Sequence, residues 1–392
     1  MNKPRVLLTY IESGMGHIMS MKAIADSLKA KYSDKLDIIE SYIMDEGNKA
    51  TADFEKFLSG CTKKTNKDKA FGIGIFWFLD LMGKQTFMRF THRTIFKKYT
   101  DATIDAMRAH NPDVIISTHY FITFAALELK KRYMPNLTVI TSNPDYNVHV
   151  WWDNRSDIFI NNNDAACNES IKKRRFKYEQ LRRVFFTARN EVVNATGTKE
   201  EYRKKYNLPL DKFTVIIADG AYAQGKAKRA CNNLIKNIKF PITILILAGK
   251  NEKVYQYFDK KKSKVPANIT LVPLRFTPLA YEYYGASDVF ITKSGPNAVL
   301  DSLYMGTPVV VDYYAHNIEK ASAKLFCEDL NCGVTCYNVS HMYRTITYLY
   351  EHPEYLQALK QNIKKNVNRE KNGSMQIADI IFSELKDKGL IA

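Results

Sequence analysis

The sequence predicts an α/β protein made of two similar halves, each built on a parallel β-sheet. Short runs rich in Val, Ile and Leu alternate with helical stretches of ten or more residues, which indicates βαβ units. The same alternation begins at residue 5 and restarts after Pro209. A chain of 392 residues is also long enough for two domains.

The first half has four expected strands, at residues 5–11, 36–41, 113–118 and 138–142. Apolar residues at helical spacing predict helices over 18–31 and 121–133. The second half has five expected strands, at residues 214–219, 243–249, 269–274, 289–293 and 309–312. Ligands of open parallel sheets bind beyond the carboxyl ends of the strands, so candidate site residues are expected in the loops that follow the strands.

The polar stretch over 196–212 suits a linker between two α/β domains, at 1–195 and 213–370. A C-terminal helix over 371–392 completes the chain, with the N-terminal domain as a candidate packing partner. Two such domains would face each other across a cleft.

The net charge of +17, from 58 Lys and Arg against 41 Asp and Glu, favours an anionic partner. No DNA- or RNA-binding signature accompanies this charge, so a nucleic-acid-binding module is the weaker interpretation and no nucleic-acid partner is expected. The longest uncharged apolar-rich stretch is far shorter than the ~20 residues that span a bilayer. The N-terminus also lacks the apolar core of a signal peptide.

The segment 71–99 holds eight aromatic residues, and residues 60–100 hold nine Lys or Arg against two Asp. Interleaved aromatic and basic side chains are typical of an element that lies on an anionic membrane surface. The alternative is a helix pair partly buried in its own domain. The side chains expected at the membrane are Phe76, Trp77, Phe78, Arg89, Arg93, Lys97 and Lys98. Peripheral attachment at the cytoplasmic face of the cell membrane follows from this interpretation, whereas the basic cluster at 172–177 fits a solvated face.

Ser13-Gly14-Met15-Gly16-His17 follows the first expected strand and precedes a helix. Gly14 and Gly16 allow a tight turn, and the helix N-terminus offers free N–H groups to a polar ligand. A dinucleotide site would need a third Gly where Met19 stands, which disfavours NAD even though Glu40 could contact a ribose. His17 lies where a ligand should bind, so it is a candidate general base as well as a candidate structural histidine.

The segment from Asp145 to Trp152 (DYNVHVWW) follows the expected strand at 138–142. It brings together an acid, the imidazole of His149 and two of the three Trp of the chain. Aromatic rings with a few polar groups are typical of pockets for sugars or lipid headgroups.

Three strand-to-helix turns of the second half carry polar and glycine residues, around Gly220, Lys250 and Ser294. Backbone N–H groups at such turns can hold a diphosphate without a metal, and Asp301 can accept bonds from ribose hydroxyls. Ordinary capped loops are the alternative. The cysteines Cys327, Cys332 and Cys336 lack a CxxC pair and a nearby His, so buried thiols are expected there and no metal site.

Four motifs, GMGH, DYNVHVWW, LAGKNEKVYQYF and TKSGPNAVLDSLYMGTPVVV, occur in this order. Together they resemble the processive diacylglycerol glucosyltransferase and monogalactosyldiacylglycerol synthase family, which is related to the N-acetylglucosaminyltransferase of peptidoglycan lipid intermediates. The similarity covers nearly the whole chain. It implies a GT-B fold with the active site between two Rossmann-like domains, and an inverting transfer from a UDP-sugar to diacylglycerol that needs neither metal nor cofactor.

By motif position, the resemblance assigns His17 and Asp145 to catalysis and leaves open which of them is the general base. It places the acceptor near Gly14, Gly16, His149 and Trp152. It places the donor near Gly220, Lys250, Asn251, Phe276, Lys293, Ser294, Gly295, Asn297, Asp301, His316, Asn317 and Glu319.

Departures from the family pattern affect the donor side. Ala221 and Ala223 interrupt a loop that is usually richer in Gly, and Asp301 replaces the more usual Glu. The family's Gly-Gln-Glu stretch appears here as Ala315-His316-Asn317. The donor sugar therefore stays open between glucose and galactose, with a β-linked glycolipid as the expected product. The remaining alternatives are another lipid or polyprenyl acceptor, for example with UDP-N-acetylglucosamine, and a non-catalytic lipid-binding relative.

Overall fold

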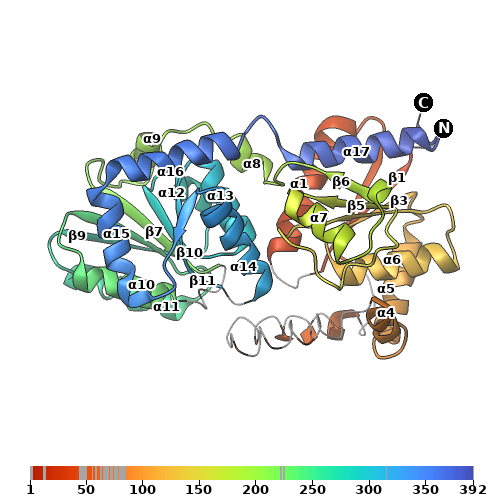
Figure 1. Cartoon of the computed structure of the whole chain (residues 1–392), viewed down its shortest axis with the longest axis horizontal. Helices are drawn as coiled ribbons and strands as arrows, with labels where there is room; N and C mark the ends of the chain where they lie inside the picture. Colours follow the sequence, from red (N-terminus) through yellow and green to blue (C-terminus); the bar gives the residue numbers. More distant parts are fainter. Residues whose placement is uncertain are drawn as a thin grey trace. The chain divides into compact units, whose positions relative to one another are not determined.

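The computed structural model describes residues 3–11, 15–43, 51–54, 56–57, 60–61, 64, 70, 74, 78, 85–220, 223, 226–314 and 316–391. Contacts divide the chain into two compact units. The first comprises most of residues 1–190 together with 371–392, and the second comprises residues 191–370. Each unit holds a six-stranded parallel sheet covered by helices (Figure 1).

The first sheet has the strand order β2-β1-β3-β4-β5-β6. Its strands are β1 (Arg5–Thr9), β2 (Asp37–Ser41), β3 (Val114–Ser117), β4 (Thr138–Ser142), β5 (Ile158–Asn161) and β6 (Leu181–Arg183). Thr9 pairs with Ser117, and Ser117 pairs with Thr141. The carboxyl ends of β1, β3 and β4 therefore meet at one edge.

The helices of this unit are α1 (Met15–Tyr32), α4 (Gln85–Arg93), α5 (Lys97–Ala109), α6 (Tyr120–Arg132), α7 (Asp164–Lys172) and α17 (Gly373–Asp387). Successive residues of a strand point to opposite faces of the sheet, and the core follows this alternation. Val6 and Leu8 face α1 and α17, whereas Leu7 faces α5 and α6.

The second sheet has the order β12-β11-β10-β7-β8-β9. Its strands are β7 (Phe213–Ala218), β8 (Ile242–Leu247), β9 (Ile269–Leu274), β10 (Val289–Lys293), β11 (Val309–Tyr313) and β12 (Gly333–Thr335). Its helices include α9 (Lys199–Lys205), α10 (Ala227–Asn237), α11 (Glu252–Asp259), α12 (Ala280–Gly285), α13 (Pro296–Tyr304), α14 (Asn317–Ala323), α15 (Met342–Glu351) and α16 (Pro353–Asn366). The short helix α8 (Asn190–Val193) stands where the chain passes from one unit to the other.

The nine expected strands are present, and the structure adds β5, β6 and β12. These three strands are only three or four residues long, and β6 and β12 lie at sheet edges. Two arginines make β6 (LRR) look like a polar loop in the sequence. Such short edge strands form because a neighbouring strand offers hydrogen bonds, and their sequences need not show an apolar pattern.

The stretch 196–212 differs from the expected linker, because it folds onto the second unit. Thr198 caps α9 in a capping box with Glu201. Arg203 is 4% exposed, and its guanidinium lies 2.8 Å from the carboxylate of Asp288, which directly precedes β10. The charged sequence of this stretch therefore includes a cation, Arg203, that is buried in an ion pair.

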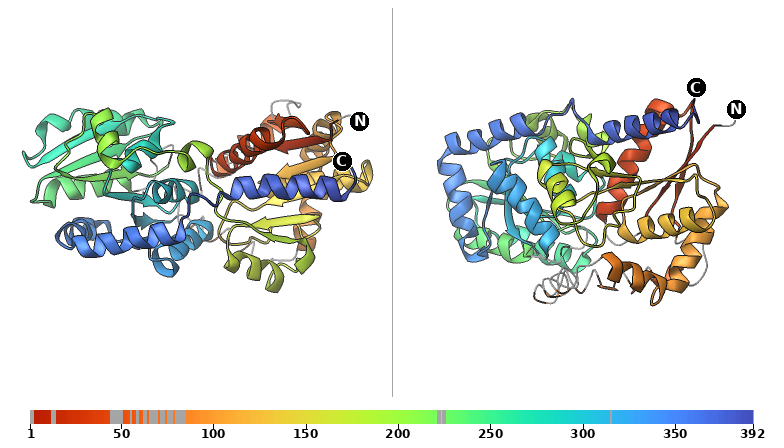
Figure 2. Two further views of the ribbon diagram at one scale, coloured as in Figure 1. Left: turned by 90° about the horizontal axis from the view of Figure 1, so that it is seen from above. Right: turned by 45° about the vertical axis from the view of Figure 1, so that its right-hand side comes forward.

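The C-terminal helix α17 belongs to the first unit and lies beside α1, as Figures 1 and 2 show in three views. The Ser27 hydroxyl of α1 donates to the Ser374 hydroxyl of α17 at 2.9 Å. Ile377, Ile381 and Leu385 are fully buried against the sheet and α1. In the part of the chain that the structure describes, no helix is long and apolar enough to cross a bilayer.

We expect Ile381→Ala to lower the free energy of unfolding of the first unit by about 2–5 kcal/mol, because it opens a cavity in a fully buried site. Urea unfolding followed by circular dichroism measures this. Ser383→Ala, on the exposed side of α17, is the matched control and should cost less than about 0.5 kcal/mol. Equal losses in both variants would show that α17 is not part of the core.

Candidate functional site

His17 lies at the carboxyl edge of the first sheet, in the first turn of α1. The helix starts at Met15, earlier than the predicted residue 18. The Nδ1 of His17 lies 2.6 Å from the carbonyl oxygen of Thr118, and the Thr118 hydroxyl donates to the His17 carbonyl at 3.0 Å. These two bonds tie the imidazole and the main chain of His17 to Thr118, the residue that follows β3.

The same bond fixes the tautomer of His17. A carbonyl oxygen can only accept, so Nδ1 carries the proton of this bond. Desolvation lowers the pKa of His17, which favours the neutral ring near pH 7. The ring therefore presents Nε2 with a free lone pair, suited to accept a hydrogen bond or a proton.

A second histidine, His119, supports His17 and was missed by the sequence analysis. His119 is buried, and its ring meets that of His17 edge-on with centroids 4.9 Å apart. Its Nδ1 accepts from the Phe121 N–H at 3.2 Å, and burial lowers the pKa of His119 well below its usual value. The signal was available in the sequence, since His119 directly follows the expected strand at 113–118.

Asp145 follows β4, two strands from β1 in the same sheet, at a spacing of about 10 Å between those strands. Its N–H donates to the Asn143 side chain at 3.1 Å, and its carbonyl accepts from Asn162 at 3.3 Å, which fixes the backbone. Asp145 is 8% exposed, and desolvation raises the pKa of its carboxyl to about 7. A buried carboxyl that titrates near neutrality is suited to proton transfer.

The structure corrects the expectation that Trp152 contacts the acceptor. Its ring is 2% exposed and packs in a core cluster with Val148, Phe159 and Phe176. Trp151 is the half-buried tryptophan of the pair, and its ring lies 4.8 Å from that of Tyr120 and 5.9 Å from that of His149. The sequence could not decide which of two adjacent tryptophans turns inward.

The glycine loop before α1 is described only in part. Gly14 lies outside the described residues. Among the residues that the structure describes, a Cβ added to Gly16 would meet no atom within 4 Å.

In the second unit, the loops after β7 and β10 are joined by Asp219. Its carboxylate accepts from the backbone N–H of Ala227 and from that of Lys293, the latter at 3.1 Å. Burial raises the pKa of Asp219. The next residue, Gly220, has a φ of +71°, a left-handed conformation that favours glycine.

Three expected donor residues contact one another. The Lys293 ammonium lies 2.7 Å from the Glu319 carboxylate, and both side chains are largely buried. The Ser294 hydroxyl donates to the Glu319 carbonyl at 2.6 Å. The charge of Lys293 is thus neutralised within the unit, and the Ser294 hydroxyl holds α14 in place.

Two helix N-termini stand at this edge. Gly295 precedes α13, whose first turn holds Pro296 and Asn297, and Asp301 is a buried residue further along the same helix. His316 occupies the N-cap position of α14, which begins at Asn317, and burial lowers the pKa of His316. Free N–H groups at such termini favour an anion.

Lys250, Asn251 and Phe276 share another corner of the second unit. The Phe276 N–H donates to the Gly249 carbonyl at 3.0 Å, and the Lys250 ammonium lies 5.4 Å from the Phe276 ring centroid. The Asn251 side chain accepts from the Val254 N–H at 3.2 Å and so caps α11. Asn251 therefore has a structural role whatever else it binds.

Asp312 is a buried acid that the sequence analysis did not single out. It lies in β11 and is 0% exposed, and neither carboxylate oxygen has a hydrogen-bond partner among the described residues. Burial and the nearby Asp219 raise the pKa of Asp312 well above its usual value. The acid at the end of the run VVVD was the available signal.

The expected membrane side chains have different surroundings. Phe76 and Trp77 lie outside the described residues, whereas Phe78 is 50% exposed. Arg89 and Arg93 bind the buried acids Asp153 and Glu128, each at 2.8 Å. Lys97 pairs with Asp101 at 2.5 Å, and Lys98 is exposed. Arg89 in particular is 22% exposed in its side chain and serves the interior of the unit.

Two family models match the chain, one in each half. The model for monogalactosyldiacylglycerol (MGDG) synthase matches residues 17–175, and the glycosyltransferase family 28 C-terminal domain matches residues 222–377. The chain belongs to this family of glycosyltransferases. It is therefore a sugar-transferring enzyme by family, as the motifs predicted.

Curated relatives of this glycosyltransferase are distant, and their matches span most of this chain. The processive diacylglycerol beta-glucosyltransferase of Bacillus pumilus (strain SAFR-032) is 23% identical over 92% of this chain and 90% of its own. Monogalactosyldiacylglycerol synthase 2, chloroplastic, of Arabidopsis thaliana is 23% identical over 83% of this chain and 69% of its own.

Solved structures show the GT-B fold for the glycosyltransferase. Acinetobacter baumannii MurG has a TM-score of 0.61 at 12% identity, covering 97% of this chain and 100% of its own. Anabaena Alr3699/HepE in complex with UDP has a TM-score of 0.59 at 10% identity, covering 98% of this chain and 100% of its own. The predicted fold class is confirmed.

We expect Trp152→Ala to lower the free energy of unfolding by about 3–5 kcal/mol, because the ring fills the core cluster. Trp151→Ala, at the half-buried neighbour, should cost clearly less. Urea unfolding of both variants measures the difference. A larger loss for Trp151→Ala would reverse the assignment of the two rings.

Proposed function

We propose that the protein transfers a hexose, glucose or galactose, from a UDP-sugar to diacylglycerol at a membrane surface, with inversion at the anomeric carbon. The observation that carries the proposal is the placement of Asp145, buried with a pKa of about 7, and the neutral His17 at one edge of the same sheet. The names of the relatives supply the acceptor class, since they act on diacylglycerol or make its galactolipid. UDP and glucose in the HepE structure supply the donor class.

Asp145 is the general base in this proposal, and His17 is its neighbour at the acceptor hydroxyl. A base works best when its pKa lies near the operating pH, which favours Asp145 over a histidine whose pKa burial lowers. The acceptor oxygen attacks the anomeric carbon, its proton passes to Asp145, and the bond from that carbon to the UDP oxygen breaks. Attack from the opposite face converts an α-linked donor into a β-linked glycolipid.

The second unit binds the donor in this proposal. The N-termini of α13 and α14 and the left-handed turn at Gly220 direct backbone N–H groups at the diphosphate. These dipoles stabilise the charge that develops on the departing UDP, so the mechanism needs no metal ion. Asp301 accepts from the ribose hydroxyls.

Attachment to the cytoplasmic face of the membrane completes the proposal. Phe78 is 50% exposed, and Phe90 and Ile95, in and just after α4, are 59% and 68% exposed. Exposed apolar side chains beside cations favour the headgroup region of an anionic bilayer.

The direct test is transfer from UDP-glucose or UDP-galactose to diacylglycerol in anionic vesicles, with the product identified by mass spectrometry. One of the two donors should give a β-linked glycosyldiacylglycerol. Transfer from neither would overturn the proposal. A product formed only with UDP-N-acetylglucosamine on a polyprenyl acceptor would reassign the substrate. Vesicle binding without UDP affinity or any product would leave a non-catalytic lipid-binding relative.

The pH dependence of kcat/KM distinguishes the two candidate bases. With Asp145 as the base, kcat/KM should fall as the pH drops below about 7, where the carboxyl becomes protonated. If kcat/KM instead falls only below pH 6.5, the proton is accepted by His17. Asp145→Asn should lower kcat by about 10²–10⁴-fold. Asp164→Asn, an exposed acid of the same unit, is the control and should leave kcat unchanged.

Asp145→Asn should also change the pH dependence of stability. A carboxyl whose folded pKa is raised contributes stability that is complete below the unfolded pKa of 3.8 and is lost as the pH rises through about 7. The variant lacks this loss, so it should gain stability relative to the wild type between pH 4 and pH 8 in urea unfolding. A constant difference across that range would contradict the raised pKa.

A further inference from the structure

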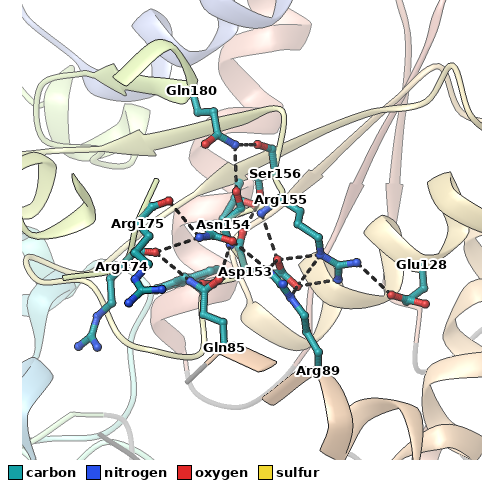
Figure 3. Close-up of polar contacts among 12 residues, drawn as sticks. Gln85, Arg89, Glu128, Asp153, Asn154, Arg155, Ser156, Arg174, Arg175 and Gln180 are labelled. Atoms are coloured by element: carbon teal, nitrogen blue, oxygen red, sulfur yellow. Dashed lines mark hydrogen bonds and ion pairs between the residues drawn. The ribbon is translucent and has the colours of Figure 1, made fainter. Parts of the chain in front are cut away.

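The loop that carries Asp145, His149 and the two tryptophans continues into residues 152–156, and helix α4 binds this continuation directly. Figure 3 shows the polar contacts around Asp153 and Asn154. The Arg89 guanidinium of α4 binds the two carboxylate oxygens of Asp153 at 2.8 and 3.1 Å. It also donates to the Asn154 side chain at 2.8 Å. One side chain of α4 thus binds two successive residues of the loop.

Gln85, one turn before Arg89, extends this contact. Its side-chain N–H groups donate to the carbonyl oxygens of Trp152 at 3.0 Å and Arg174 at 3.2 Å. Its oxygen accepts from the Asn154 N–H at 3.3 Å and from Arg89 at 3.2 Å. Gln85 therefore binds the backbone of the loop on both sides of Asp153 (Figure 3).

The carboxylate of Asp153 is the centre of the contact. It is 5% exposed, and it also accepts from the Arg155 guanidinium at 2.7 Å, which in turn binds Glu128 of α6. Burial alone would raise the pKa of Asp153, but hydrogen bonds from Arg155 and Arg89 hold it below its usual value. A buried carboxylate held by two guanidiniums makes this a rigid contact, because breaking a buried ion pair is costly.

Contacts within the rest of the loop connect Asp153 to the residues of the candidate site. The Trp152 N–H donates to the His149 carbonyl at 3.2 Å, and the Trp152 ring is fixed in the core cluster. His149 in turn contacts the ring of Trp151. The segment between Asp153 and Asp145 is therefore short and held at both ends.

Helix α4 and the segment that links it to α5 also carry exposed apolar side chains, unlike the side of α4 that binds the loop. Phe90 and Ile95 are the most exposed large apolar residues of this stretch, at 59% and 68%. Residues 85–98 contain four Lys or Arg and no acidic residue, and three of these cations, Arg89, Arg93 and Lys97, pair with acids from other parts of the unit. Exposed apolar side chains in a cationic surrounding are complementary to an anionic lipid surface, rather than to a protein core or a nucleic acid.

We propose that Gln85 and Arg89 are positioning residues that hold the loop 145–156 to α4, so that docking of α4 on an anionic lipid surface sets the position of this loop. Helix α4 and the loop 145–156 then form one rigid element. It contacts lipid through Phe90 and the acceptor through the loop. The inference rests on the proposed function only where the acceptor is taken to come from that lipid surface.

The test follows the loop itself and needs no sugar donor. Only three tryptophans occur, so the Trp77→Phe protein reports Trp151 and Trp152 alone by fluorescence. Vesicles of phosphatidylcholine with phosphatidylglycerol are added, and binding is measured in parallel by sedimentation. We expect the emission to change on binding. Arg89→Ala in this background should still sediment with the vesicles but should lose the change.

Three further variants make the comparison sharp. Gln85→Ala removes the contacts to Trp152 and Arg174 without leaving a buried charge, so it tests the contact if Arg89→Ala does not fold. Phe90→Ser should weaken sedimentation itself. Lys29→Ala, which breaks an exposed ion pair with Glu40 elsewhere in the same unit, should behave like the parent. An emission change that is absent from the bound parent, or that bound Arg89→Ala and bound Gln85→Ala both keep at the size seen in the parent, overturns the proposal.

A kinetic readout applies once transfer is established. The ratio of kcat/KM on vesicle diacylglycerol to that on a soluble short-chain diacylglycerol should fall by about tenfold in Gln85→Ala. An equal loss on both acceptors would contradict the coupling. Failure of the proposed transfer would leave the fluorescence result intact, so the two ideas fail separately.

Discussion

The parallel pairing of β1, β3 and β4 is the constraint on which the first unit depends. Parallel strands end at a common edge, and the register that aligns Thr9, Ser117 and Thr141 brings three separate loops there. His17, His119 and Asp145 meet the same edge because each follows one of these strands closely. The second unit repeats the arrangement, with Asp219 bonded to the backbone of Lys293 across the neighbouring strands β7 and β10. In both units, the strand order determines which loops and candidate site residues lie together.

Sequence reasoning succeeded where apolar runs were long enough to be unambiguous. The nine predicted strands are all present, and the motifs identified the family. It failed for β6 and β12, which exist because a neighbouring strand offers hydrogen bonds. Side-chain direction was also beyond the sequence, as Trp151 and Trp152 illustrate, because only the surrounding core decides which ring is buried.

Charged residues gave the least reliable predictions. Arg89 and Arg203 both belong to basic, polar stretches in the sequence, yet each binds a buried carboxylate. The 58 Lys and Arg are therefore not all surface cations, since some of them neutralise acids inside each unit. The acids Asp153, Asp288 and Glu319 each have a specific cation, whereas Asp145 has burial alone as the cause of its shifted pKa. That difference separates a structural carboxylate from a candidate base.

The place of α17 has a consequence for how the chain matures. Met21, Ile24 and Leu28 of α1 share one apolar cluster with Ile377, Ile381 and Leu385. During translation, the first of these groups leaves the ribosome long before the second is made. The first sheet thus spends most of synthesis with an uncovered apolar face, and its core closes only when residue 385 has emerged. The unit made first is completed last.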